Sequence, residues 1–446
     1  MTGLPDHKID IVRRLVEAAP DRVVGRLQAA LAGSGGDAAL AAVRKLVGAE
    51  ADDRRLRNMV LAPIAPLCVG DGRDPKRLVF PLRVLALMWR GLKAEAPLQI
   101  DAAQSLLEDL YPHESPPVAF DDLVMRAALL LRAGQQRDFR EAAELADAAR
   151  PGGAALLAQC LDLGPIVRQT TVKLPDWITR ITEERAAAAR VAYNDAVGVA
   201  EDAGPWFFEM LAAQLAQPWQ VLRIVSAVMD RPTERYMAAS EFAVFALRLM
   251  EEVDGNLAAV ANFDTDGGPS AGRAAGKTVE LLTLQISEIE DSLEMGREGG
   301  WGGRLANQKK SLAGTVERRL RDAEKAVALA LPTQAMRVAR VMRDVPRLTP
   351  GPDEALVRRA LSLLHFAEEI RSSANYGGFA STRAKVLEHL GETLDHYVED
   401  VLDTLRHNEA PEPAVAKQFL GVVADFNALI RDARAAETVR RRAAAA

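Results

Sequence analysis

A chain of 446 residues, 49% of them hydrophobic, is long enough to bury sizeable cores, which excludes a disordered protein. Its 56 basic and 62 acidic residues give a net charge of −6 and are mixed along the whole chain, which argues against a nucleic-acid groove because such a groove needs a basic stripe. Arginine outnumbers lysine and alanine is abundant, as in bacterial-type, GC-rich coding sequences, so this bias carries no functional meaning.

Helical patterns dominate wherever the sequence is periodic, and residues that favour strands rarely cluster. No two alternating runs are joined by Asn-Gly or Asp-Gly, and strands do not alternate with helices. We therefore expect an all-α fold with helices of roughly 12 to 25 residues. The order of the breaks predicts an elongated array of antiparallel helical hairpins, solenoid-like in the N-terminal half, followed by a long helical hairpin and a small helical bundle.

Residues 1–162 are expected to form the N-terminal helical hairpins, one of which turns at Gly134. The N-terminus lacks the apolar run of a signal peptide, and no window approaches about eighteen apolar residues, so we expect neither export nor membrane insertion. Cys68 and Cys160 lie among apolar residues and are expected to be small buried hydrophobes in a reducing compartment. These features predict a cytoplasmic protein.

Residues 163–264 form a middle helical segment rich in Trp and Phe. Three of the five Trp residues lie here, at positions 177, 206 and 219. Trp206 and Trp219 follow Pro at expected helix starts, where an aromatic ring commonly packs on its own helix. We therefore expect both rings to join the core rather than to bind a ligand.

Residues 265–345 predict a long helical hairpin with a glycine-rich tip. In its first helix a spacing of 3, 4, 3, 4 gives a narrow apolar stripe over 279–293, made of Val279, Leu282, Ile286, Ile289 and Leu293. We expect this stripe to zip against the second helix, although it would also suit self-association into a homo-oligomer. At the tip, Trp301 stands between glycine pairs and is the protein-interaction candidate; the alternative is that its ring folds back onto the hairpin.

The string AGRAAGKT at 271–278 fits a relaxed phosphate-binding loop, in which Lys277 would reach the phosphates and Thr278 would hold Mg²⁺. Its context differs from such a loop, because a helical pattern and an acidic turn precede it where a strand is required. The structural interpretation makes the string the first turns of a helix with Ser270 as N-cap. A nucleotide-binding switch or enzyme using this loop is the alternative function.

Residues 346–446 predict a C-terminal helical bundle with a basic tail, in three helices at 354–373, about 382–407 and about 412–437. One face of the second helix gathers the polar residues His389, Glu392, His396, Glu399, Asp403 and His407. Spacings of three and four place the candidate ligands His389, Glu392, His396 and Glu399 where one metal ion could reach two of them, and His365 with Glu368 repeats the spacing on another helix. The apolar residues lie opposite, which favours a solvated face. A metal-binding bundle through 389–407 is the second alternative function.

Other catalytic signatures, such as His-Glu-x-x-His, Gly-x-Ser-x-Gly and Cys-x-x-Cys, do not occur in the sequence. The sequence therefore favours a non-enzymatic, cytoplasmic protein-protein interaction or scaffolding protein that needs no cofactor. Its helical array would present an extended surface to protein partners.

Overall fold

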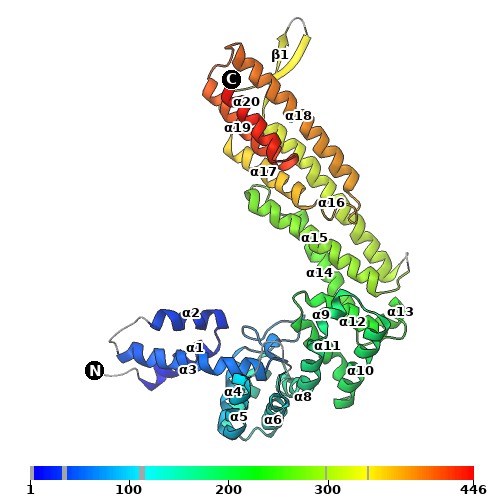
Figure 1. The fold of residues 1–446 in the computed structure, drawn as a ribbon. Helices are drawn as coiled ribbons and strands as arrows, with labels where there is room; N and C mark the ends of the chain where they lie inside the picture. Colours follow the sequence, from blue (N-terminus) through cyan, green and yellow to red (C-terminus); the bar gives the residue numbers. More distant parts are fainter. Residues whose placement is uncertain (1–4, 33–37, 110–115, 297–298, 339–340) are drawn as a thin grey trace. The chain divides into compact units, whose positions relative to one another are not determined.

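The computed structural model describes residues 5–32, 38–109, 116–296, 299–338 and 341–446 (Figure 1). Helices α1 to α20 make up most of these residues, which confirms the predicted all-α class. A solenoid-like stacking of the N-terminal half is not confirmed. Within the described ranges, no helix combines the length and the apolar content needed to cross a membrane.

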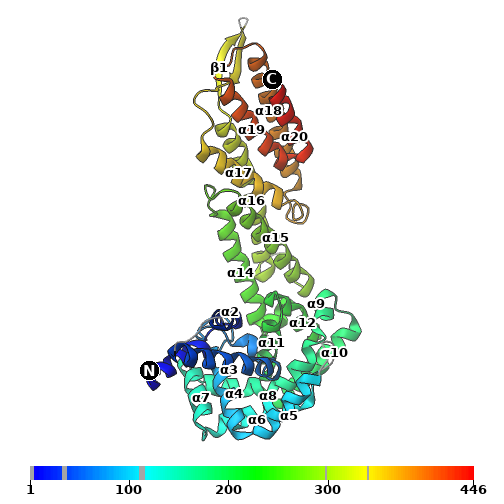
Figure 2. The ribbon, with the colours of Figure 1, turned by 60° about the vertical axis from the view of Figure 1, so that its left-hand side comes forward.

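The chain divides into two compact units, and Figure 2 shows the helices of each from a second side. Unit 1 comprises Met1–Pro232 and Tyr236–Phe245. Unit 2 comprises Thr233–Arg235 and Ala246–Ala446. The three residues Thr233–Arg235 therefore pack with unit 2, although the chain on both sides of them belongs to unit 1.

Unit 1 consists of α-helices and two short 3-10 helices, η1 and η2. Its elements are α1 (Asp6–Glu17), α2 (Asp21–Ala32), α3 (Ala38–Val60), η1 (Ala65–Leu67), α4 (Arg83–Glu95), α5 (Pro97–Asp109), α6 (Val118–Ala133), α7 (Arg137–Ala149), α8 (Gly153–Thr171), α9 (Leu174–Thr179), α10 (Glu183–Val199), α11 (Ala203–Gln214), η2 (Pro218–Gln220) and α12 (Val221–Val228). Helix α13 (Glu234–Ala238) and helix α14 (Ala243–Ala261) contribute to both units. Gly134 ends α6 in the left-handed conformation, so the predicted turn between α6 and α7 is confirmed.

A buried arginine ties three helices of unit 1 together. Arg168 of α8 donates to the carbonyl oxygens of Met59 and Val60 at 2.8 and 2.6 Å, and its Nε bonds Asp121 of α6 at 2.8 Å. The last carbonyl groups of a helix lack intrahelical partners and carry partial negative charge. A guanidinium placed there donates hydrogen bonds to them, and they stabilise its positive charge. Arg168 therefore fixes α8 to α6 and to the C-terminal end of α3.

The middle segment contains an aromatic core that differs from the expected one. The ring of Phe208 lies 5.3 Å from that of Phe242, edge to face, and 5.7 Å from that of Tyr193, stacked. Trp206 and Trp219 are only half-buried, so the expectation that both rings join the core is wrong. Buried phenylalanines fill the core instead, namely Phe207, Phe208, Phe242 and Phe245.

The two cysteines behave as predicted from their apolar neighbours. Cys68 and Cys160 are free and buried. Burial raises the pKa of the Cys68 thiol to about 12 and raises that of Cys160 further. Both therefore stay protonated and act as small core side chains.

Unit 2 is a helical assembly with one small sheet. Its elements after α14 are α15 (Gly268–Ser292), α16 (Gly300–Ala330), β1 (Thr333–Val338), β2 (Val341–Pro346), α17 (Glu354–Glu369), α18 (Ala380–Arg406), α19 (Pro413–Ile430) and α20 (Ala433–Ala445). The five residues of the 279–293 stripe are buried inside this unit. Helix α15 packs most extensively on α17 rather than on α16, so the expected zipping of the two hairpin helices is only a minor contact.

A β-hairpin between α16 and α17 was not expected from the sequence. β1 and β2 pair antiparallel, from Thr333 opposite Pro346 to Val338 opposite Val341. Arg343 of β2 bonds Asp400 of α18 at 2.6 Å, which attaches the hairpin to the helices. Within the described ranges this is the only sheet.

The last predicted helix, at about 412–437, is two helices. Helix α19 ends at Ile430, and Asp432 then accepts a hydrogen bond from the backbone N–H of Ala435 at 2.8 Å. A carboxylate in this position is a favoured N-cap, so Asp432 begins α20 as a new helix. Arg431 between them reaches back to Asp395 of α18 at 2.8 and 2.5 Å.

Candidate functional site

The string AGRAAGKT lies inside α15, as its structural interpretation predicted. Lys277 is exposed, and the Thr278 hydroxyl donates to the carbonyl oxygen of Ala274 at 3.0 Å. The backbone N–H groups of the string are used within the helix, so they do not converge on a phosphate. The helix begins earlier than expected, with Gly267 and not Ser270 at the N-cap position.

The glycines of this string let α15 approach α17 closely. A Cβ atom on Gly272 would lie 1.9 Å from the carbonyl oxygen of Ser362, and one on Gly276 would lie 2.4 Å from Cβ of Glu369. The two glycines are four residues apart and share one helix face, the spacing that allows two helix backbones to come together. Helix packing therefore explains the glycines that resemble a phosphate-binding loop.

The predicted polar face of α18 is exposed, and its members have partners of their own. Nδ1 of His389 lies 3.0 Å from Glu324, and Nδ1 of His396 lies 2.7 Å from the backbone carbonyl oxygen of Glu392. Arg442 donates to Glu399 at 2.7 Å and lowers the pKa of that carboxyl. The four candidate metal ligands thus lie along an exposed helix face.

His365 and Glu368, the second predicted pair, lie together on α17 at 3.4 Å. Burial and the nearby guanidinium of Arg273 lower the pKa of His365. Among the described residues, no group of three or more His, Cys, Asp or Glu side chains is arranged to hold a metal ion.

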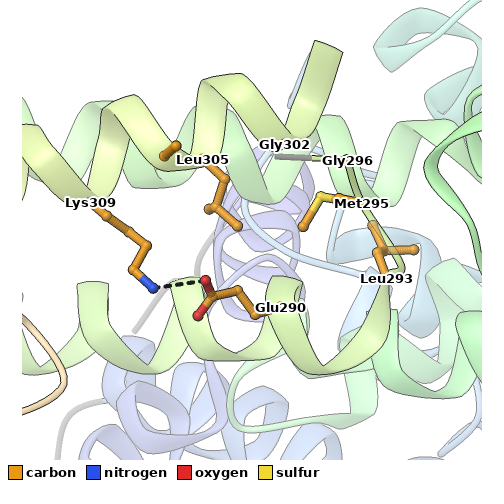
Figure 3. Close-up of a pocket in the computed structure, with 8 residues that line it drawn as sticks. Glu290, Leu293, Met295, Gly296, Gly302, Leu305 and Lys309 are labelled. Carbon is orange, nitrogen blue, oxygen red and sulfur yellow. Dashed lines mark hydrogen bonds and ion pairs between the residues drawn. The ribbon is translucent and has the colours of Figure 1, made fainter. Parts of the chain in front are cut away.

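A concave site in unit 2 lies between the end of α15 and the start of α16. This α15–α16 groove has a volume of about 490 Å³ and is lined by Glu290, Leu293, Met295, Gly296, Gly302, Leu305, Ala306 and Lys309 (Figure 3). Leu293 and Leu305 form its buried floor, and Met295 is half-buried above them. The volume falls in the range of ligand pockets, and methionine adapts to differently shaped apolar groups.

A charged cluster closes one end of the groove. Lys309 of α16 donates to Glu290 of α15 at 2.7 Å (Figure 3), and the hydroxyl of Tyr376 donates to the other oxygen of Glu290 at 2.5 Å. Lys309 also lies 5.2 Å from the centre of the Tyr376 ring. Burial alone would raise the pKa of Glu290, but the two hydrogen bonds outweigh it and hold that pKa below its usual value.

Two contacts fix the start of α16 beside the groove: a close approach of Gly302 to Gly296, and a helix cap supplied by Glu234. A Cβ atom on Gly302 would lie 1.7 Å from the carbonyl oxygen of Gly296, so α16 starts directly against the preceding chain. The carboxylate of Glu234 accepts hydrogen bonds from the backbone N–H groups of Trp301 at 2.7 Å and of Gly302 at 3.3 Å. Glu234 thus satisfies two of the unpaired N–H groups at the start of α16.

Trp301, the predicted docking residue, lies in the first turn of α16 and not in a loop. Its side chain is half-buried. Its neighbour Gly302 lines the groove, whereas Trp301 is not among the lining residues. Trp301 as the protein-interaction residue therefore stays a prediction, and the groove lies beside it.

The partners that complete this site come from distant parts of the chain. Glu234 is 67 residues from Trp301, and Tyr376 is 86 residues from Glu290. No local spacing in the sequence links such residues. The only signal available was the cluster of glycines in the sequence at 296–303, which did not identify the groove.

Comparisons with protein-family models, with curated protein sequences and with solved structures find no match for this chain. The function must therefore be argued from the groove itself.

Proposed function

We propose that this protein is a non-enzymatic interaction protein that docks an apolar segment of a protein partner in the α15–α16 groove. The observation that carries the proposal is the pairing of an apolar floor, made by Leu293 and Leu305, with a charged cluster at one end. An apolar pocket with a few placed polar groups is the usual form of a recognition site. The partner side chain would fill the pocket, and a polar group beside it would reach Lys309 or Glu290.

The ionisable groups of the groove suit binding better than proton transfer. A general acid or base works best when its pKa lies near the working pH. The pKa of Glu290 is lowered and that of Tyr376 is raised, so both move away from neutrality. Lys309, Glu290 and Tyr376 also bond one another, which fixes the end wall of the groove.

We also propose that the protein acts in the cytoplasm and does not bind nucleic acid. Its two buried thiols suit a reducing compartment. Its basic and acidic residues are mixed along the sequence, whereas nucleic-acid binding favours a basic stripe. A partner of mixed charge is consistent with these features.

The docking proposal is tested by filling the groove. Ala306 lines it and is exposed, so Ala306→Trp blocks the space without disturbing the core. Ala328 is exposed on the same helix outside the groove, so Ala328→Trp is the matched control. Peptides are selected by phage display against the unmodified protein and then assayed against both variants.

We expect peptides that share a large apolar residue, that bind the unmodified protein and Ala328→Trp, and that fail to bind Ala306→Trp. Peptides that bind Ala306→Trp as well as the unmodified protein would place the docking surface elsewhere. A selection that returns no peptide with a common apolar residue would also contradict the proposal.

A further inference from the structure

Unit 1 contains a second, partly open cavity of about 160 Å³ between α1, α3 and α4. Charged side chains from all three helices line it, which is unusual because ionised groups are rarely buried unless they are paired. Glu17 of α1, Arg57 of α3 and Trp89 of α4 are each at most 4% exposed. The cavity therefore contains buried polar groups whose hydrogen bonds can be checked one by one.

Every carboxylate that lines the cavity already has a cationic partner. Glu17 is bonded by Arg83 and Arg90, and Glu50 is bonded by Arg54 and Arg57. Lys93 bonds Asp53 at 2.7 Å near the mouth. The acidic groups that line the cavity are thus satisfied.

The donors of the cavity are not all satisfied. Arg57 bonds Glu50 through Nη2 at 2.9 Å, but its Nε and Nη1 have no hydrogen-bond acceptor. The indole Nε1 of Trp89, which lines the same cavity, also lacks one. These atoms are shielded from bulk solvent, so an acceptor for them has to be held inside the protein. Leaving such donors unpaired is costly, most of all on a charged group.

We propose that this cavity binds a small oxyanion, either a carboxylate or a phosphate, through Arg57 and Trp89. An oxyanion supplies only acceptors, and guanidinium binds carboxylate and phosphate oxygens through parallel N–H bonds. The volume corresponds to about five water molecules, enough for formate, acetate or inorganic phosphate. The unpaired groups are all N–H donors, which favours an anion over a cation.

The test uses the full-length protein and three probes, formate, acetate and inorganic phosphate, at constant ionic strength with chloride as the balancing anion. Binding is measured by isothermal titration calorimetry and by the rise in melting temperature with probe concentration. Trp89→Phe removes one donor while keeping an aromatic ring in place. Trp177→Phe is the matched control, because Trp177 is equally buried at 2% exposure and does not line the cavity.

We expect saturable binding of at least one probe, weakened by at least about tenfold in Trp89→Phe and unchanged in Trp177→Phe. Arg57→Lys keeps the positive charge but loses the planar set of guanidinium N–H donors, so it should also weaken binding. This variant replaces Trp89→Phe in the test if Trp89→Phe does not fold. The probe that binds distinguishes a carboxylate ligand from a phosphate. Absence of saturable binding for all three probes, or equal binding by both cavity variants and the unmodified protein, would show that the cavity holds only water.

Discussion

Two glycine-bearing stretches of unit 2, at 268–276 and 296–303, have different structural roles. In the first, Gly272 and Gly276 remove side chains so that the backbone of α15 can lie against α17. In the second, Gly302 lets α16 start against the carbonyl oxygen of Gly296. Both glycines line the α15–α16 groove. A glycine pattern therefore indicates close backbone approach, and its surroundings decide whether the result is a packed interface or a binding site.

The contact between α15 and α17 predicts the largest change in the free energy of unfolding, caused by adding one methyl group. Gly272→Ala should lower the free energy of unfolding by about 3 kcal/mol, because the added Cβ meets the backbone of Ser362, which cannot rotate away. Gly314→Ala is the control, since it is exposed within α16 with open space around it and should stabilise by roughly 0.5–1 kcal/mol. Calorimetry measures the melting temperatures of both variants and of the unmodified protein. Equal melting temperatures would mean that α15 does not depend on close approach to α17.

The cap at the groove predicts a smaller loss. Glu234→Ala should lower the free energy of unfolding by about 1 kcal/mol, because the N–H groups of Trp301 and Gly302 lose their shared carboxylate. Hydrogen exchange of the first turn of α16 should accelerate in the variant. Unchanged exchange at Trp301 and Gly302 would show that Glu234 does not cap the helix.

The charged end of the groove predicts a pH dependence. The pKa of Glu290 is lower in the folded protein than its ordinary value of 4.5, so its stabilisation is present above about pH 4.5 and is lost as the pH falls through the lower folded value. Glu290 is 37% exposed, so solvent screening keeps the effect below about 1 kcal/mol. The melting temperature of Glu290→Gln should fall below that of the unmodified protein at pH 6, and the difference should shrink as the pH falls below about 4.5. A difference in melting temperature that grows as the pH falls would contradict this prediction.

The phosphate-loop pattern predicts the smallest effect. ATP and GTP with Mg²⁺ should leave the melting temperature unchanged in the unmodified protein and in Lys277→Ala, because the string is an ordinary helix segment packed on α17. Thermal scans with both nucleotides check this. Stabilisation that disappears in Lys277→Ala would establish the nucleotide-binding alternative.

Local patterns in the sequence predicted the features that depend on one helix at a time. The apolar stripe of α15, the polar face of α18 and the buried cysteines all follow from spacing and neighbouring residues. Features that depend on contacts between distant residues were missed, since no local pattern encodes them. Examples are the packing of α15 on α17 and the bonds from Glu234 and Tyr376 that complete the groove.

Two other misses have local causes. The runs that form β1 and β2 are not joined by Asn-Gly or Asp-Gly, so the usual hairpin signal was lacking. The break between α19 and α20 contains neither Pro nor Gly, and only the Asp432 side chain marks it. Sequence periodicity alone therefore predicted one continuous helix through the break between α19 and α20.

The central claim is that the α15–α16 groove docks a protein segment, and the most direct measurement is the affinity of a selected peptide for the matched pair Ala306→Trp and Ala328→Trp. Isothermal titration should give binding to Ala328→Trp within about twofold of the unmodified protein and binding to Ala306→Trp weakened by at least about tenfold. Equal affinity of the two variants would contradict the claim.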